Sequence, residues 1–167
     1  MDAMEAILSR RSIRKYTGEA VPKGLVDELL KAAMSAPSAS NQQPWHFIII
    51  DERSILNKIP EFHPYSSMLG QAALAIAVCG DSASQPVFWV QDCSAATENI
   101  LLAAHAKGLG AVWLAIHPYA ERVQGIRKML ALPENIVPLC LVSIGHPNEQ
   151  KPPGQRYDPA KVHRNSW

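Results

Sequence analysis

The stretch that decides how this chain is interpreted reads Arg10-Arg11-Ser12-Ile13-Arg14-Lys15-Tyr16. It crowds positive side chains and a hydroxyl group beside a short helical pattern. If the backbone after Arg10 is extended, alternate side chains share a face, so Arg10, Ser12 and Arg14 point one way while Ile13 points toward the core. Guanidinium groups and a hydroxyl together satisfy the acceptor oxygens of a phosphate. The alternative is a solvated basic turn or a set of surface ion pairs.

The composition of the chain limits the classes of protein it can be. Its 167 residues are 47% hydrophobic and carry a formal net charge of +1, which fits a single domain over residues 1–167 with a full hydrophobic core. The near-neutral balance argues against a nucleic-acid binder, because acidic residues offset the basic cluster. No apolar run approaches a signal sequence or the ~20 residues of a membrane span. The 3 cysteines lack the paired spacing of disulfides or zinc sites, so we expect a reducing, cytoplasmic setting.

The first half of the chain alternates helix and strand patterns. Asp2, with Glu5 three residues later, marks the start of a helix that precedes the basic stretch. Pro22 opens a second helix, which ends before Pro37. The aromatic and β-branched run Trp45–Ile50 predicts a buried strand. A short helix over residues 55–59 and a second strand over residues 74–79 follow.

The second half is dominated by the longest helical pattern, over about residues 87–107. Its later part is apolar on almost every side, which predicts a central, buried helix, and Gly108 is placed to cap it. Strands are predicted at residues 111–116 and 137–144, with a helix at residues 121–130 between them. Residues 145–167 contain 4 prolines and predict an extended C-terminal arm.

The second informative stretch is the polar loop Pro37-Ser38-Ala39-Ser40-Asn41-Gln42-Gln43-Pro44-Trp45. Its Asn and Gln side chains each offer a carbonyl acceptor and an amino donor. A flat heterocycle that presents donors and acceptors along one edge needs this complement, and flavin is such a ring. For the loop taken alone, the alternative is a polar segment that caps the next element.

Together, the basic stretch, this loop and the segment from Asp92 to Gly110 closely resemble the nitroreductase family of flavin mononucleotide (FMN) enzymes. The resemblance covers essentially the whole chain. It implies an α+β fold, with a central, mostly antiparallel sheet flanked by helices and an extended arm over residues 145–167. It also implies a homodimer that binds FMN in clefts between its subunits, so that neither chain builds a complete site alone.

The resemblance assigns residues to the parts of such a cleft. One chain would hold the phosphate and ribityl chain, while the loop of its partner would line the ring. The tail departs from the family pattern at one position. Many members have a lysine two residues before the tail arginine, Arg156 here, and this chain has Gly154. The implied cofactor-binding residues are Arg10, Arg11, Ser12, Arg14 and Arg156 at the phosphate and ribityl chain, Pro37, Ser38, Ala39, Ser40, Asn41 and Gln43 at the ring, Trp113, Leu114, Ala115 and Ile116 beside its redox face, and Gly145 and His146 where the tail begins.

The activity implied by the resemblance is that of an oxidoreductase. Bound FMN would take hydride from NAD(P)H and pass it to nitroaromatic, quinone or related small-molecule acceptors by a ping-pong mechanism. No side chain has to be catalytic, because a flavin performs the hydride chemistry while the protein supplies position, hydrogen bonds and charge. A flavin carrier or sensor without turnover is one alternative, and a structural dimer that uses the basic stretch for ion pairs is another. Tyr65, Met68 and Phe88 either shape a substrate mouth or pack in the core.

Other motifs in the chain are weak. Gly108-Leu109-Gly110 follows a helix and has Trp113 at the third glycine position, so a dinucleotide-binding fingerprint is not indicated. The 6 histidines are scattered without ligand spacing, which argues against a metal site. Cys79 and Cys140 lie in apolar strands and are expected to be buried, and Cys93 is expected to be structural.

Overall fold

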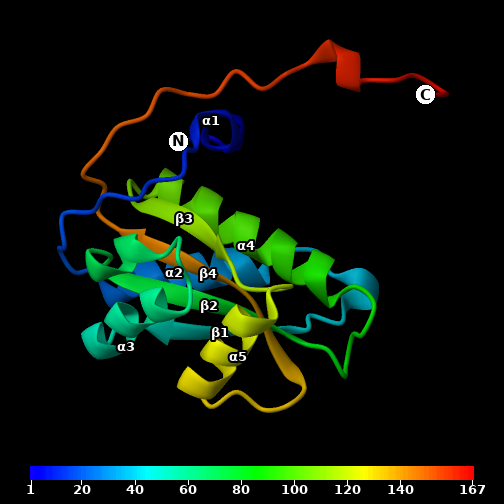
Figure 1. The fold of residues 1–167 in the computed structure, drawn as a ribbon. Coiled ribbons are helices and arrows are strands. Elements are labelled where there is room, and N and C mark those ends of the chain that lie inside the picture. Colours follow the sequence, from blue (N-terminus) through cyan, green and yellow to red (C-terminus); the bar gives the residue numbers. More distant parts are fainter.

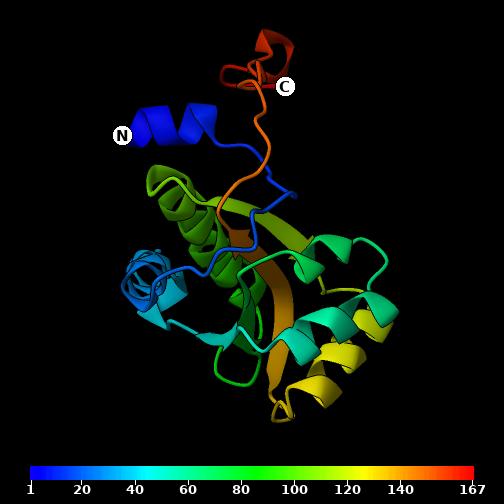
Figure 2. The ribbon, with the colours of Figure 1, turned by 90° about the vertical axis from the view of Figure 1, so that its left-hand side faces the viewer.

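The computed structural model describes residues 1–167 and is built around one antiparallel sheet with helices on both faces (Figures 1 and 2). The strands lie in the order β1-β2-β4-β3, which makes β1 and β3 the edges of the sheet. Each neighbouring pair is antiparallel, so the predicted α+β fold is confirmed. The strands are β1 (Trp45–Ile50), β2 (Leu74–Asp81), β3 (Gly110–Ala115) and β4 (Ile136–Gly145).

The helices cover the two faces of the sheet in pairs, as Figure 2 shows. On one face α2 (Lys23–Met34) packs against α4 (Trp89–Ala106), and the other face carries α3 (Arg53–Lys58) and α5 (Ala120–Met129). The first helix, α1 (Ala3–Ser9), contacts α4 from outside these layers. Short 3₁₀ turns occupy Ala39–Asn41, Ile59–Glu61, Ser67–Gly70 and Pro159–Lys161. None of the helices is both long enough and apolar enough to cross a membrane.

The sheet separates two hydrophobic cores. Along β2, Ile76 and Val78 face the core beneath α2 and α4, whereas Ala75 and Ala77 face the core beneath α3 and α5. Successive side chains of a strand point to opposite faces. Because helices cover both faces, the central strands are apolar at nearly every position rather than alternating with polar residues.

The helix ends confirm the capping signals in the sequence. The Oδ1 atom of Asp2 accepts a hydrogen bond of 2.9 Å from the backbone N–H of Glu5, which caps α1. At the end of α4, Gly108 has a φ angle of +75°, a left-handed conformation that glycine adopts without steric cost. The long helix itself is central and largely buried, as predicted.

The burial predicted for the first strand is wrong in part. Only Trp45, at the start of β1, and Ile50, at its end, are buried, and His46 and Ile49 are exposed. The cause is topological, because β1 pairs only with β2 and forms an edge of the sheet. An apolar run by itself does not distinguish a central strand from an edge strand.

The basic stretch runs beside the opposite edge of the sheet. Ser12 forms an isolated parallel bridge with Ala111, and the N–H of Ile13 donates a hydrogen bond of 3.0 Å to the carbonyl oxygen of Ala111. Further along, Tyr16 bridges to Pro147 at the start of the arm. The predicted arm is confirmed as an extended segment, which passes α1 and ends away from the body of the domain (Figures 1 and 2).

Candidate functional site

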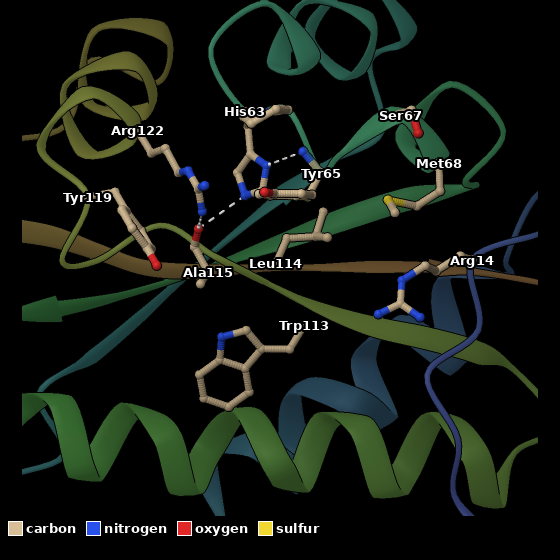
Figure 3. Close-up of a pocket in the computed structure, with 11 residues that line it drawn as sticks. Arg14, His63, Tyr65, Ser67, Met68, Trp113, Leu114, Ala115, Tyr119 and Arg122 are labelled. Carbon is tan, nitrogen blue, oxygen red and sulfur yellow. Dashed lines mark hydrogen bonds between the residues drawn. The ribbon is translucent and has the colours of Figure 1, made fainter.

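A cavity of about 550 Å³ lies along the edge strand β3. Residues of β3 form one wall, and the opposite wall comes from residues 63–68 and from the start of α5 (Figure 3). Arg14 enters this cavity from the basic stretch. The lining residues are Arg14, His63, Pro64, Tyr65, Ser67, Met68, Trp113, Leu114, Ala115, Tyr119 and Arg122.

The backbone of β3 presents polar groups along its outer edge, beside the cavity. The carbonyl oxygen of Ala111 accepts from Ile13, and that of Ala115 accepts from residues outside the sheet. In an antiparallel pair, alternate residues direct their N–H and C=O groups away from the neighbouring strand. The alternation therefore also turns the N–H and C=O groups of Trp113 outward, along the free edge beside the cavity.

His63 is held as a neutral imidazole at the Ala115 carbonyl. The side chain is only 1% exposed. Its Nε2 atom lies 3.1 Å from the carbonyl oxygen of Ala115, and its Nδ1 atom accepts a hydrogen bond of 3.3 Å from the N–H of Tyr65. A neutral imidazole has one donor and one acceptor nitrogen, so Nε2 carries the hydrogen. Burial, and then the positive charge of Arg122, lower the pKa of His63 and favour this neutral form.

The basic stretch divides its side chains between different surroundings. The guanidinium of Arg14 lines the cavity, while its backbone N–H donates a hydrogen bond of 2.6 Å to Glu149. Arg10 points toward α4, where its Nε atom lies 3.3 Å from a carboxylate oxygen of Glu98. Within this chain, Ser12 contributes its carbonyl oxygen to a hydrogen bond of 2.8 Å from Lys151. Arg14 is thus the member of the stretch that reaches the β3 cavity.

Arg11 and Arg156 meet over Gly154. A Cβ atom placed on Gly154 would lie 3.1 Å from Nε of Arg156 and 3.3 Å from Nη1 of Arg11. Arg11 donates a hydrogen bond of 2.6 Å to the carbonyl oxygen of Pro152, and neither arginine takes part in an ion pair. Two guanidinium groups without a carboxylate are suitable donors for an anion. A larger residue at position 154 would crowd both of them.

The polar loop lies beside the first turn of α4 and does not line the β3 cavity. Ser40, Asn41 and Gln43 have φ angles of 51°, 55° and 50°, which are left-handed conformations. The N–H of Ala39 donates a hydrogen bond of 3.0 Å to Asp92, and further hydrogen bonds form within the loop. The side-chain amide of Gln43 donates a hydrogen bond of 2.8 Å to the side chain of Asn41, and the backbone N–H of Gln43 donates one of 3.0 Å to the hydroxyl of Ser38. The backbone N–H of Asn41 donates one of 3.0 Å to the carbonyl oxygen of Ser38. The remaining loop residue of the predicted set, Pro37, is exposed.

Three other predicted residues do not line the cavity. Ile116 is buried, and its N–H donates a hydrogen bond of 3.1 Å to the carbonyl of Leu139. Gly145 packs against the ring of Tyr16, and the carbonyl of His146 accepts a hydrogen bond of 3.0 Å from Thr17. The contacts of Gly145 and His146 hold Tyr16 and Thr17, at the end of the basic stretch, against the end of β4.

Some residues of the cavity were absent from the sequence prediction. Tyr65 and Met68, predicted either for a substrate mouth or for the core, do line the cavity, and Phe88 does not. His63, Tyr119 and Arg122 were missed as site residues. The His-Pro pair at 63 indicated only extended or turn backbone, and Arg122 has the spacing of an ordinary polar residue on an amphipathic helix.

Comparisons with known proteins identify the family of the chain. The Nitroreductase family model matches residues 7–63 and 60–146. A protein of Methanothermobacter thermautotrophicus, provisionally named an NADH dehydrogenase/NAD(P)H nitroreductase, is 50% identical over 171 residues, which cover 100% of this chain and 88% of that protein.

Solved structures are similar over the same extent. An FMN-dependent nitroreductase from Clostridium difficile R20291 superposes with a TM-score of 0.93 at 32% identity, covering 98% of this chain and 99% of that one. A Bacteroides thetaiotaomicron protein, also provisionally named an NADH dehydrogenase/NAD(P)H nitroreductase, superposes with a TM-score of 0.96 at 46% identity, covering 99% of this chain and 98% of that one. The two sequence motifs, the fold and these matches together establish that the chain belongs to the nitroreductase family.

Proposed function

We propose that this protein is an FMN-dependent oxidoreductase that uses NAD(P)H to reduce nitroaromatic, quinone or related small-molecule acceptors. The observation that carries the proposal is the cavity along β3, which combines a free strand edge with a guanidinium group at one end. The names of relatives support it, since an FMN reductase of Bacillus subtilis and an NADPH-flavin oxidoreductase of Vibrio harveyi are 25% and 26% identical to this chain.

The residues of the site fit FMN. A flavin ring is flat and carries donors and acceptors along one edge, and the outward N–H and C=O groups of Trp113 offer the complementary pair. The phosphate is an anion with several acceptor oxygens, and Arg11 and Arg156 are two uncompensated guanidinium groups that both lie next to Gly154. Arg14 links these regions because its backbone belongs to the docked stretch and its side chain lines the cavity.

The chain's own groups bind and orient rather than exchange protons. When bound, FMN supplies the acceptance and donation of hydride. His63 is engaged at both ring nitrogens, so it is not free to act as a general acid or base. Together with Arg122 it holds the Ala115 carbonyl, which fixes the edge of β3. This arrangement agrees with a mechanism in which donor and acceptor occupy one cleft in turn.

A homodimer would complete the site. The amide-rich loop is outside the β3 cavity of its own chain, and its Ser40, Asn41 and Gln43 side chains are exposed. Apolar side chains also remain uncovered. Many of them lie at the N-terminus, on α1 and on the arm, at Met1, Met4, Ile7, Leu8, Tyr157, Val162 and Trp167. An interface that buries these surfaces would bring the loop of one chain to the cavity of the other.

The test is the visible absorption spectrum of the purified protein followed by anaerobic reduction. We expect flavin bands that NADH or NADPH bleaches and that an added nitroaromatic or quinone restores. Parallel double-reciprocal plots at several acceptor concentrations are expected for a ping-pong mechanism. A bound flavin that neither nucleotide reduces would identify a carrier instead. A protein that stays colourless after incubation with FMN would contradict the proposal.

The phosphate assignment is tested by substituting the arginines. We expect Arg14→Ala and Arg156→Ala to bind FMN about tenfold more weakly, because a charge-assisted hydrogen bond contributes roughly 1.5–3 kcal/mol. Equilibrium dialysis against free FMN measures the dissociation constant. Lys128→Ala is the control, since this exposed lysine on α5 has no ion pair and does not line the cavity. Equal affinity in all the variants would refute the assignment.

A further inference from the structure

The β3 cavity contains a second arginine that FMN binding does not require. Figure 3 shows Arg122 on the opposite side of the cavity from Arg14, with Leu114 and Ala115 between them. The phosphate and ring assignments use Arg11, Arg14 and Arg156 and leave Arg122 without a role toward the cofactor. A guanidinium group in a binding cavity is a candidate binding site for an anionic group of a ligand.

The guanidinium of Arg122 is fixed in place. Its Nη1 atom donates a hydrogen bond of 2.9 Å to the carbonyl of Ala115. Its Cζ atom lies 4.1 Å from the ring centroid of Tyr119 and 5.7 Å from that of Tyr65, both within the range of cation–π attraction. The side chain has therefore already lost the rotamer freedom that a flexible arginine would lose on binding a ligand.

No carboxylate neutralises this group. Arg122 takes part in none of the ion pairs of the chain, and the Ala115 carbonyl accepts the only hydrogen bond recorded for its guanidinium. A guanidinium has five N–H donors in a planar fork, so most of them remain free. The neighbouring His63 is neutral at its two hydrogen bonds and a histidine is never negatively charged, so it does not compensate the charge of Arg122. The position therefore combines fixed geometry, free donors and uncompensated charge.

We propose that Arg122 binds a carboxylate carried by the electron acceptor, and that the preferred acceptors are planar aromatic acids. The guanidinium fork matches a carboxylate in a bidentate pair. The aromatic part follows from the walls, since Tyr65 and Tyr119 flank the guanidinium. This inference rests on the proposed reductase activity and specifies the substrate class of that site.

The experiment compares an acidic acceptor with its neutral analogue. The ratio of kcat/KM for 4-nitrobenzoate to that for 4-nitrobenzamide is measured in the wild type, Arg122→Gln and Arg122→Lys. We expect Arg122→Gln to lower this ratio about tenfold, as expected for loss of a charge-assisted hydrogen bond. Arg122→Lys should retain part of it, because the charge remains and the fork is lost. Lys128→Gln removes one charge from the exposed side of the same helix and should leave the ratio unchanged.

A second readout does not depend on turnover. Benzoate and benzamide cannot be reduced as nitro compounds are, and their binding is measured by the change in the spectrum of bound flavin. Benzoate should bind more tightly than benzamide to the wild type, and Arg122→Gln should remove the difference. A thermal melt of each variant shows whether the substitution acts only on folding.

The outcomes separate the two claims. A wild type without flavin, or with flavin that NAD(P)H does not reduce, overturns the proposed function and this inference with it. If the flavin is reducible but the wild type and Arg122→Gln prefer benzoate over benzamide equally, the inference alone is overturned. Arg122 then serves only to hold the Ala115 carbonyl. A change confined to the preference for NADPH over NADH assigns the anion to the donor's phosphate and likewise overturns it.

Discussion

At the scale of single residues, Asp92 shows how a buried polar group shapes the candidate site. It lies in the first turn of α4, is 5% exposed and accepts a hydrogen bond of 3.0 Å from the N–H of Ala39. Its other carboxylate oxygen has no partner. The loop it holds contains three non-glycine residues with left-handed backbone, each of which costs on the order of 1 kcal/mol or more. Asp92 therefore helps to impose the loop conformation from beneath.

Removing that acceptor should weaken cofactor binding. We expect Asp92→Ala to raise the FMN dissociation constant about tenfold, because the loop loses the contact that offsets its backbone strain. Asp92→Asn retains an acceptor oxygen and should recover most of the affinity. Fluorescence titration with FMN measures binding, and urea unfolding of each variant measures stability. A loss of stability with unchanged FMN affinity in Asp92→Ala would assign Asp92 to the core alone.

Three buried thiols and one buried phenol should make the stability of the protein fall at alkaline pH. Burial raises the pKa of Cys79, Cys93 and Tyr16 to about 12 and raises that of Cys140 further. In the unfolded chain these groups lose protons at lower pH, so above about pH 9 the unfolded state binds fewer protons than the folded state. The free energy of unfolding should therefore be constant from pH 7 to 8 and should fall as the pH rises from 9 to 11.

The size of that fall follows from linkage. Each group contributes up to about 1.4 kcal/mol per pH unit between its unfolded and folded pKa. Urea unfolding at pH 7.5, 9 and 10.5 measures the decrease. Tyr16→Phe removes one titrating group and should flatten the curve above pH 10, although it also removes hydrogen bonds to the carbonyls of Ile13 and Ser143. A free energy of unfolding independent of pH up to 10.5 would contradict the assignment.

At the scale of elements, the site depends on how the basic stretch docks on β3. The bridge between Ser12 and Ala111 and the hydrogen bond from Ile13 set its register. Gly110 permits the approach, because a Cβ atom there would lie 2.6 Å from Cγ2 of Ile13 and 2.9 Å from its Cβ. A β-branched side chain cannot move its Cβ away without moving the backbone. The docking therefore carries Arg14 to the cavity only while position 110 stays a glycine.

We predict that Gly110→Ala displaces the stretch and weakens FMN binding. Overpacking of this kind costs roughly 1–3 kcal/mol, and the urea midpoint should fall accordingly. Gly24→Ala is the matched control, because Gly24 lies in α2 with no atom within 4 Å of an added Cβ. Alanine in a helix is favoured over glycine, so this control should be neutral or slightly stabilising. Gly110→Ala with wild-type stability and FMN affinity would show that the stretch can dock differently.

The elements were predictable because local signals agree along the chain. Asp2, Pro22 and Gly108 mark helix ends, and the structure confirms α1, α2 and α4 next to them. The strands were also predicted to within two residues at either end. The order of strands was not predictable, because pairing is decided by contacts between distant segments. For this reason the sequence did not predict that β1 is an edge strand with exposed residues.

The candidate site was predictable only where its residues belong to a motif. Arg14 and the Trp113–Ala115 segment were predicted and do line one cavity. His63 and Arg122 were not, because each joins the site through the Ala115 carbonyl, 52 and 7 residues away in the sequence. Such contacts form only when the fold brings His63 and α5 to the end of β3. No periodic or spacing signal in a single sequence encodes them.

At the scale of the whole molecule, the two parts of the proposed site, the cavity and the polar loop, lie apart within one chain. The cavity and its arginines lie along β3, and the loop lies beside the start of α4. The arm leaves the domain beyond α1 and ends with Trp167 fully exposed (Figure 1). Extended segments with uncovered aromatic side chains are suited to packing on another subunit. A second copy of the chain would place a loop, an arm and a cavity in reciprocal positions.

Mixed dimers test this arrangement directly. Arg14→Ala damages the cavity half and Asn41→Ala the loop half, so each variant alone should bind FMN poorly. In a mixed dimer one site combines both damaged halves and the other combines both intact halves, because each site takes its halves from different chains. Random mixing makes about half of the dimers mixed and restores roughly a quarter of the sites. Co-purified, differently tagged chains titrated with FMN measure this fraction. If the mixture bound no more FMN than the two variants separately, both halves of the site would have to come from one chain.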